Sequence, residues 1–167
     1  MAQRTPRTPR TPSSVVGRTD PAQQLDRQLC FALYSSSLLM TKLYQPLLAP
    51  LGLTYPQYLV MLALWEQDAV GVGALGARLY LDSGTLTPLL KRLEAAALLT
   101  RLRDTADERR VVVSLTPAGR ALRRKAAQAP AEVACAVGID LAQLAHLTAQ
   151  LQALRSNIAG HLEPAAA

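Results

Sequence analysis

The sequence predicts a mainly α-helical fold with one small β-hairpin, and three observations support this fold class. Half of the 167 residues are hydrophobic, and many of these are Leu and Ala, which favour helices. Apolar residues recur at steps of three and four in several stretches, which is the period of a helix with one buried face. The run Val111-Val112-Val113 favours a strand, because β-branched side chains are restricted at χ1. The length allows one domain with appended helices.

The hairpin follows two predicted helices. Apolar spacing predicts a short helix over 72–81 and then a second helix that runs to about Leu98. Asp82 or Ser83 can cap the second helix, because a short side-chain oxygen accepts from the first-turn N–H groups. Two strand-like runs come next, at 99–103 and 109–115, with a charged turn between them. This order predicts a winged helix-turn-helix, and therefore DNA binding.

The positive charge is concentrated in the same segment. Residues 78–125 contain 11 Lys and Arg against five Asp and Glu, whereas 21–77 and 126–167 are slightly acidic. The first 20 residues carry a further small excess of positive charge. A basic reading head is what phosphate contact requires, since each neutralised phosphate releases condensed counterions. The alternative is that these arginines only keep a small helical protein in solution.

Composition also sets limits on the class of protein. No run of about 18 apolar residues predicts a membrane span, and no secretory signal is recognisable at the N-terminus. Cys30 and Cys135 lie far apart and His146 and His161 lack metal-like spacing, so we expect no metal site and no cofactor. We expect a cytoplasmic protein that is not an enzyme, in which any disulfide would be transient.

The predicted domain organisation has three parts. Residues 1–20 contain three Arg-Thr-Pro triplets and are predicted to be disordered, either as a basic arm that adds non-specific DNA affinity or as a tail without function. Residues 21–160 form the winged-helix domain, and 161–167 form a C-terminal tail. Within the domain, the DNA-binding head spans about 54–116, between dimerisation helices at about 22–50 and 117–160.

The flanking helices are predicted from their end signals. A long helix covers 25–48, and Pro46 and Pro50 are expected to close it. A capping box with Pro in the first turn begins the next helix near Thr54. After the wing, a helix opens at Thr116 and runs toward Ala129, and a last helix begins at Asp140. These apolar helices exceed the needs of the head, which predicts a homodimer.

Aromatic residues gather around one cysteine. Six of the seven aromatics lie between residues 31 and 65, and Cys30, Tyr34 and Tyr44 share one side of the first long helix. Cys30 and Tyr44 are separated by about 21 Å along a straight helix, so they meet only if the helix folds back or a second copy crosses it. Phenols that donate to sulfur favour the thiolate. The alternative is that Cys30 is a small buried hydrophobe among core aromatics.

Three motifs resemble a known family of transcriptional regulators. The charged wing over 104–110, which ends in Leu115-Thr116, is similar to the signature of MarR-type regulators. The stretches LCFALY at 29–34 and LDSGTLTPLLKRLE at 81–94 are similar to the subgroup that senses organic hydroperoxides. The resemblance covers about 22–160 and leaves out the Arg-Thr-Pro tail.

This resemblance implies roles for individual residues. It implies that Cys30 is the peroxidatic residue, that Tyr44 and Tyr55 of the partner subunit hydrogen-bond it, and that Cys135 resolves it; Tyr34 is expected to line the same pocket. It also implies that Asp107 orients Arg109 in the minor groove. The residues expected to contact DNA are Ser83, Thr85, Thr87, Lys91, Arg92, Asp107, Arg109 and Arg110.

The function that follows is a repressor with a redox switch. We expect a homodimer that binds an inverted-repeat operator in double-stranded DNA and releases it when an organic hydroperoxide oxidises Cys30. Three alternatives stay open at this stage. They are a MarR-type regulator relieved by a non-covalent aromatic ligand, a thiol peroxidase and a non-specific chromatin-packing protein.

Overall fold

The computed structural model describes residue 20 and residues 23–103, 107 and 110–162. The chain divides into two compact units, Met1–Ser37 and Leu38–Ala167. The first unit contains the 3-10 helix η2 (Leu25–Arg27) and the beginning of α1 (Leu29–Leu48). The long first helix is therefore confirmed, although it begins four residues later than predicted.

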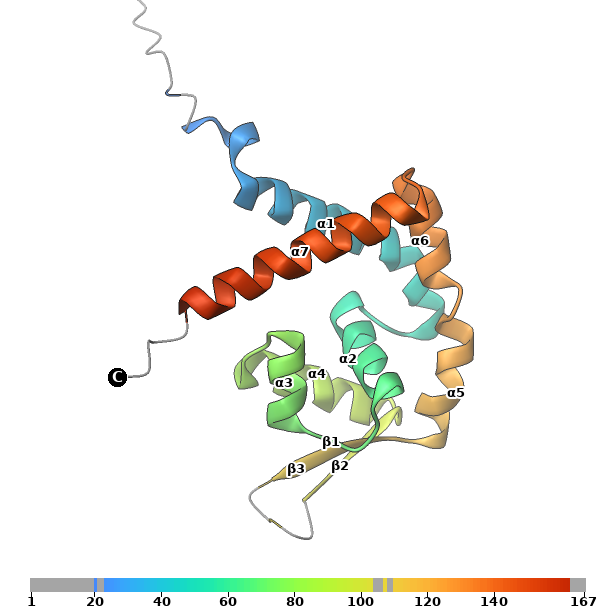
Figure 1. Cartoon of the computed structure of the whole chain (residues 1–167). Helices are drawn as coiled ribbons and strands as arrows, with labels where there is room; N and C mark the ends of the chain where they lie inside the picture. Colours follow the sequence, from blue (N-terminus) through green and yellow to red (C-terminus); the bar gives the residue numbers. More distant parts are fainter. Residues whose placement is uncertain (1–19, 21–22, 104–106, 108–109, 163–167) are drawn as a thin grey trace, which may run out of the picture. The chain divides into compact units, whose positions relative to one another are not determined.

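The second unit contains the rest of α1 and all later elements. These are η3 (Ala49–Leu51), α2 (Tyr55–Glu66), β1 (Val70–Gly71), α3 (Val72–Leu79), α4 (Ser83–Ala95), β2 (Leu99–Arg103), β3 (Val111–Leu115), α5 (Pro117–Ala126), α6 (Ala129–Val137) and α7 (Leu141–Leu162). Helices α2, α3 and α4 lie on one side of the three strands, and β2 and β3 form the hairpin (Figure 1). This arrangement confirms the predicted winged helix-turn-helix.

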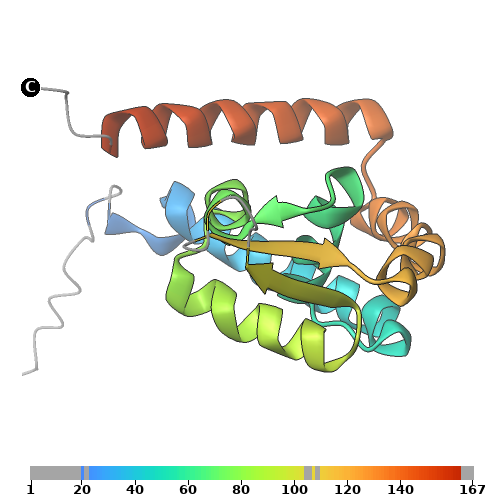
Figure 2. The same cartoon turned by 90° about the horizontal axis from the view of Figure 1, so that it is seen from below.

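The hairpin of β2 and β3 belongs to a three-stranded antiparallel sheet. Its strand order is β1-β3-β2, with Val70 opposite Val113 and Leu99 opposite Leu115. Strands β2 and β3 run side by side next to α4 (Figure 2). β2 has the predicted bounds, but β3 begins at Val111, so Arg110 lies outside it. The sequence did not predict β1, because two residues are too short to show an alternating pattern.

Residues in the left-handed conformation explain why the head helices end earlier than predicted. Tyr80 has φ +55° directly after α3, and Ala97 has φ +55° between α4 and β2. A left-handed residue terminates helical hydrogen bonding, so α3 ends at Leu79 and α4 at Ala95. The predicted bounds at 81 and 98 were wrong because no glycine marks either turn.

The flanking helices follow their predicted end signals in part. The Gln57 side chain accepts a 2.8 Å hydrogen bond from the Thr54 N–H, which confirms this half of the capping box. The prediction that Pro46 closes the first helix was wrong, since Pro46 lies inside α1. Pro46 has no N–H to donate to the Lys42 carbonyl, and the helix continues for only two further residues, to Leu48. The helix opened by Thr116 ends at Ala126, before the predicted Ala129.

The core of the second unit lies between the helices of the head and the sheet. Its most deeply buried side chains come from the end of α1, from α2, α3 and α4, and from the strands: Leu48, Tyr58, Val60, Met61, Leu64, Leu75, Leu86, Leu90, Leu93, Leu99 and Val113. The indole N–H of Trp65 donates to the Gly119 carbonyl at 2.9 Å and joins α2 to α5. Gly119 has no room for a side chain, because a Cβ there would lie 2.0 Å from the Leu98 carbonyl oxygen.

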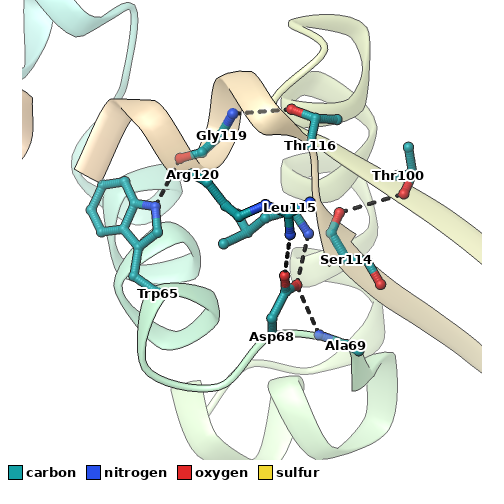
Figure 3. Close-up of polar contacts among 9 residues, drawn as sticks. All are labelled: Trp65, Asp68, Ala69, Thr100, Ser114, Leu115, Thr116, Gly119 and Arg120. Carbon is teal, nitrogen blue, oxygen red and sulfur yellow. Dashed lines mark hydrogen bonds and ion pairs between the residues drawn. The ribbon is translucent and has the colours of Figure 1, made fainter. Parts of the chain in front are cut away.

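Asp68 connects the end of α2 to the sheet and to α5 (Figure 3). Its Oδ1 accepts hydrogen bonds from the N–H groups of Ala69 and Leu115, both at 2.8 Å. Its Oδ2 forms a 2.6 Å ion pair with Arg120. Directly after β3, the Thr116 hydroxyl accepts from the Gly119 N–H at 3.0 Å and caps α5. These contacts hold the base of the wing against the helices.

Helix α7 differs from the helices of the head in that none of its residues is buried. Arg155 of this helix lies over the ring of Tyr80, with 4.6 Å from its Cζ to the ring centroid. No single helix of the described chain is both long and apolar enough to cross a membrane, although 29–51 and 55–66 meet those criteria together as a bent pair.

Candidate nucleic-acid interface and cysteine region

Helix α4 has one buried face and one polar face, as the sequence predicted. Leu86, Leu90 and Leu93 are at most 1% exposed and fix the helix against the core. The opposite face exposes the side chains that the sequence assigns to DNA contact, namely Ser83, Thr85, Lys91 and Arg92, while Thr87 is half-buried. A polar helix face with hydroxyl and basic side chains can reach base edges and phosphates in a major groove.

The N-terminus of α4 is fixed by Asp82. Its carboxylate accepts from the Thr85 N–H at 2.8 Å and from the Thr85 hydroxyl at 2.9 Å. Hydrogen bonding from the Thr85 backbone, followed by its hydroxyl, holds the pKa of Asp82 below its ordinary value. Asp82 therefore stays ionised as a helix cap, and the Thr85 side chain is oriented by it.

A second carboxylate fixes the base of the wing. Glu94 of α4 accepts from the Arg101 guanidinium, with 2.9 Å to Nε, and from the Arg101 N–H at 3.2 Å. The Arg101 side-chain hydrogen bonds lower the pKa of Glu94. The contact joins α4 to β2. Sequence reasoning missed this pair, because a separation of seven residues across a helix–strand turn has no characteristic pattern.

An open hollow of about 390 Å³ lies between the start of α3, α4 and the strands. Its polar lining comes from Thr87, Arg101 and Arg110, and glycines 71 and 73 leave backbone close to it. Arg101 is already paired with Glu94, so the Arg110 guanidinium is the group on this concave surface that can attract an anionic group such as a phosphate. This hollow brings Thr87 of α4 together with Arg110, which directly precedes β3.

The tip of the wing is described only in part. Asp107 is exposed, and its carbonyl accepts a 2.9 Å hydrogen bond from the Arg110 N–H. Arg109 lies outside the described residues, so the predicted orientation of Arg109 by Asp107 lies outside them as well. Arg110 is exposed.

Both cysteines are free thiols on exposed positions. Cys30 lies in the first turn of α1, in the first unit, and Cys135 lies near the end of α6, in the second unit. Tyr34, one turn after Cys30, is 62% exposed. The alternative that Cys30 is a buried core residue is therefore wrong for the single chain. An exposed thiol near a helix start is accessible to an oxidant.

The tyrosines predicted to support the thiolate form a cluster in the second unit. The ring centroids of Tyr44 and Tyr55 lie 4.8 Å apart, and Tyr58 lies 5.7 Å from Tyr44. Burial raises the pKa of all three phenols, and for Tyr44 the proximity of Tyr55 adds to this effect. The phenols thus stay protonated at physiological pH, and each can donate a hydrogen bond. Sequence reasoning included Tyr44 and Tyr55 but not their contact with Tyr58.

Fold and site together define a winged helix-turn-helix transcriptional regulator. The family model described as "Transcriptional regulator SarA/Rot" matches residues 42–125. This chain belongs to the MarR/SarA type of transcriptional regulators.

Two relatives with similar sequences are also transcriptional regulators. The HTH-type transcriptional regulator TtmR of Methylorubrum extorquens is 48% identical over 145 residues, which cover 87% of this chain and 74% of TtmR. The organic hydroperoxide resistance transcriptional regulator of Bacillus subtilis is 54% identical over 110 residues, covering 66% and 75% of the two chains.

A solved relative is AbfR. The structure of reduced AbfR bound to DNA is 32% identical with a TM-score of 0.73, and the match covers 83% of this chain and 95% of AbfR. A structure of disulfide-formed AbfR is also 32% identical, with a TM-score of 0.57. That match covers 84% of this chain and 93% of AbfR. The chain is accordingly a DNA-binding transcriptional regulator.

Proposed function

We propose that this chain is a repressor that senses organic hydroperoxides through Cys30 and releases its operator when Cys30 is oxidised. The observation that carries the proposal is the 54% identity with the Bacillus subtilis organic hydroperoxide resistance regulator. The exposed Cys30 thiol and the paired phenols of Tyr44 and Tyr55 supply groups suited to this chemistry.

The proposed active form is a homodimer built on the helices outside the head. Helix α1 exposes several large apolar side chains, and so does α7. The exposed set is Leu29, Leu33, Leu38, Leu39 and Leu43 on α1, and Leu141, Leu147, Leu151, Ile158 and Leu162 on α7. Long helices with such faces are stable in water when a second copy covers them. In this dimer, Cys30 of one protomer approaches Tyr44 and Tyr55 of its partner, whose phenols donate to the thiolate.

DNA recognition is proposed to use the exposed face of α4 and the wing. Ser83, Thr85, Thr87, Lys91 and Arg92 would enter the major groove, and Asp107, Arg109 and Arg110 would act at the flanking minor groove. Two heads related by a dimer axis match the two halves of an inverted-repeat operator. The reduced AbfR structure bound to DNA supports a DNA-binding reduced state.

The proposed oxidation step balances as follows. The Cys30 thiolate attacks the terminal oxygen of the hydroperoxide, an S–O bond forms and the O–O bond breaks. The alkoxide takes a proton and leaves as the alcohol, so the hydroperoxide is reduced and the sulfur becomes a sulfenic acid. The Cys135 thiol of the partner then attacks this sulfur, an S–S bond forms and water leaves. The disulfide form of AbfR supports a bond of this type in the family.

Operator release follows from the requirement that both heads match one DNA spacing. A covalent bond between Cys30 on α1 and Cys135 on α6 constrains helices that are connected directly to the head on both sides. A change in the angle between the heads removes the simultaneous fit of two recognition helices, which is a coupling between two distinct sites.

The decisive experiment measures operator binding by the wild-type protein and by Cys30→Ser, before and after one equivalent of cumene hydroperoxide. We expect the wild type to release DNA and to recover binding after dithiothreitol, while Cys30→Ser stays bound. Cys135→Ser is the matched control, and it should release DNA but accumulate sulfenic acid or a mixed disulfide. Release by oxidised Cys30→Ser would contradict the proposal, and release without oxidant by an aromatic acid would favour a non-covalent ligand.

A further inference from the structure

A single cation on α1 is not used by the DNA-binding surface. Lys42 is the only Lys or Arg between residues 28 and 77, and it precedes the basic segment 78–125. Its side chain is exposed and forms no ion pair with any of the residues that the structure describes. Glu66 and Asp68 are the acidic residues that lie between Lys42 and the basic segment in the sequence. They are already paired with Arg78 and Arg120. An ammonium group without a carboxylate partner has its electrostatic attraction available for a ligand.

Lys42 lines a hollow of about 380 Å³ between the end of α1 and the start of α2, within the second unit. The lining residues are Thr41, Lys42, Gln45, Ala49, Leu53, Thr54, Tyr55 and Pro56. Leu53, Pro56 and the Tyr55 ring make much of this surface apolar. The Thr54 hydroxyl already contacts the Gln57 side-chain oxygen at 3.0 Å. Lys42 is the one charged residue among those that line the hollow. An apolar surface with one cation suits a ligand that has an apolar body and an anionic end.

We propose that this hollow binds the carboxylate end of a fatty-acid hydroperoxide, with Lys42 as its ion-pairing group. The inference rests on the proposed function, because Tyr55 both lines the hollow and belongs to the phenol pair assigned to Cys30 of the partner subunit. The carboxylate lies against Lys42, the chain runs over Leu53 and Pro56, and the peroxide group points to the phenols. The oxidation step is the one already given, and the alcohol that leaves is a hydroxy fatty acid.

The charge of Lys42 is expected to set a preference for the acid over its ester, whereas most of the affinity for either ligand comes from apolar contacts. An exposed ion pair contributes a modest free energy, which corresponds to up to about a fivefold preference for the acid over its neutral ester. Salt screens such a pair, so the preference should decrease between low and high ionic strength. The apolar contacts are shared by acid and ester and are insensitive to salt.

The first experiment uses the full-length protein on its operator. The concentration for half-release is measured for a fatty-acid hydroperoxide, its methyl ester and cumene hydroperoxide. In the wild type we expect a preference of up to about fivefold for the acid over the ester. Lys42→Met should remove this preference, and Lys42→Arg should retain it because the charge remains. Equal potency of acid and ester in the wild type, or a preference unchanged in Lys42→Met, would overturn the inference.

The second experiment separates this inference from the proposed function. Binding of decanoate and decan-1-ol is measured by calorimetry in the Cys30→Ser protein, in which no oxidation occurs. Decanoate should bind more tightly than decan-1-ol, and Lys42→Met should abolish the difference. If no peroxide releases DNA but decanoate binding depends on Lys42, the proposed function fails and the site stands. If decanoate and decan-1-ol bind equally, the site fails whatever the peroxide response.

Discussion

Helices α4 and α7 both carry leucines at steps of three and four, yet only α4 buries them within the chain. Leu86, Leu90 and Leu93 of α4 are at most 1% exposed, whereas Leu147 and Leu151 of α7 are 46% and 39% exposed. The same sequence period therefore has two outcomes. It closes a core where α2, α3 and the sheet lie opposite, and on α7 it leaves an apolar face that we assign to a second copy.

This comparison predicts that the head tolerates core truncation poorly. Leu93→Ala removes a fully buried side chain in α4 and should lower the free energy of unfolding by about 3 kcal/mol, from lost transfer energy plus the residual cavity. The control is Leu102→Ala, because Leu102 of β2 is 67% exposed. This substitution should change the free energy of unfolding by less than about 0.5 kcal/mol. Denaturant unfolding measures both, and similar losses would mean that the head has no distinct core.

Polar contacts at the base of the wing should have the next largest effect. Asp68→Ala leaves the half-buried Leu115 N–H without its 2.8 Å acceptor, which should cost about 1–2 kcal/mol. Asp68→Asn keeps an acceptor oxygen and loses only the solvent-exposed ion pair with Arg120, so most of the stability should remain. Thermal unfolding of the two variants separates the contributions. Equal losses would assign the effect to the ion pair instead.

A glycine at the turn after α4 should stabilise the head. Ala97 has φ +55°, a conformation that strains L-residues, so Ala97→Gly should raise the free energy of unfolding by about 0.5–1 kcal/mol. Ala121→Gly in α5 is the matched control and should lower it by about 1 kcal/mol, because that position is helical. Two variants of identical chemistry are thus expected to shift the melting temperature in opposite directions.

The link between α4 and β2 should depend on pH. Arg101 lowers the pKa of Glu94 below its ordinary value of 4.5, so the folded state favours the ionised carboxylate. This contribution is present above pH 4.5 and is lost as the pH falls through the lowered pKa. Glu94→Gln should therefore flatten the acid limb of the stability curve and leave the rest of its shape unchanged. Glu132→Gln, on the exposed surface of α6, should reproduce the wild-type curve.

The element order and the buried face of α4 could be predicted because both depend on local pattern. The Asp82 cap, the Thr116 cap and the leucine period all act within a few residues. Strand β1 could not be predicted, because it is defined by its pairing with Val112 and Val113, about 40 residues later in the chain. The Asp68 contacts and the Tyr44–Tyr58 contact likewise depend on tertiary packing.

The site residues divide in the same way. The exposed face of α4 follows from its helical period, so Lys91 and Arg92 were assigned correctly to the surface. Cys30 and Tyr44 were grouped by sequence distance along one helix, but the geometry assigned to them requires a partner subunit. A single sequence specifies the apolar face that such a partner would cover, and it contains no pattern for the angle at which two copies cross.

The smallest effect on the head is expected from substitutions on the exposed apolar face of α7. The double variant Leu147→Glu, Leu151→Glu places two charges on the face of α7 that we assign to the dimer, so it should dissociate the dimer in analytical ultracentrifugation. The head buries its own core, and its unfolding should change little. Gln150→Glu with Gln152→Glu adds the same charge at exposed polar positions of α7 and should leave the dimer intact.

The same pair of variants tests whether the two regions are independent. A dissociated double variant that keeps its head folded should bind a half-operator weakly and lose the tighter binding that two linked heads give to the full inverted repeat. If the double variant unfolds entirely, the head is not stable alone, and its buried leucines depend on the dimer. If it stays dimeric, α7 is not the interface, and the exposed leucines of α1 become the surface to test.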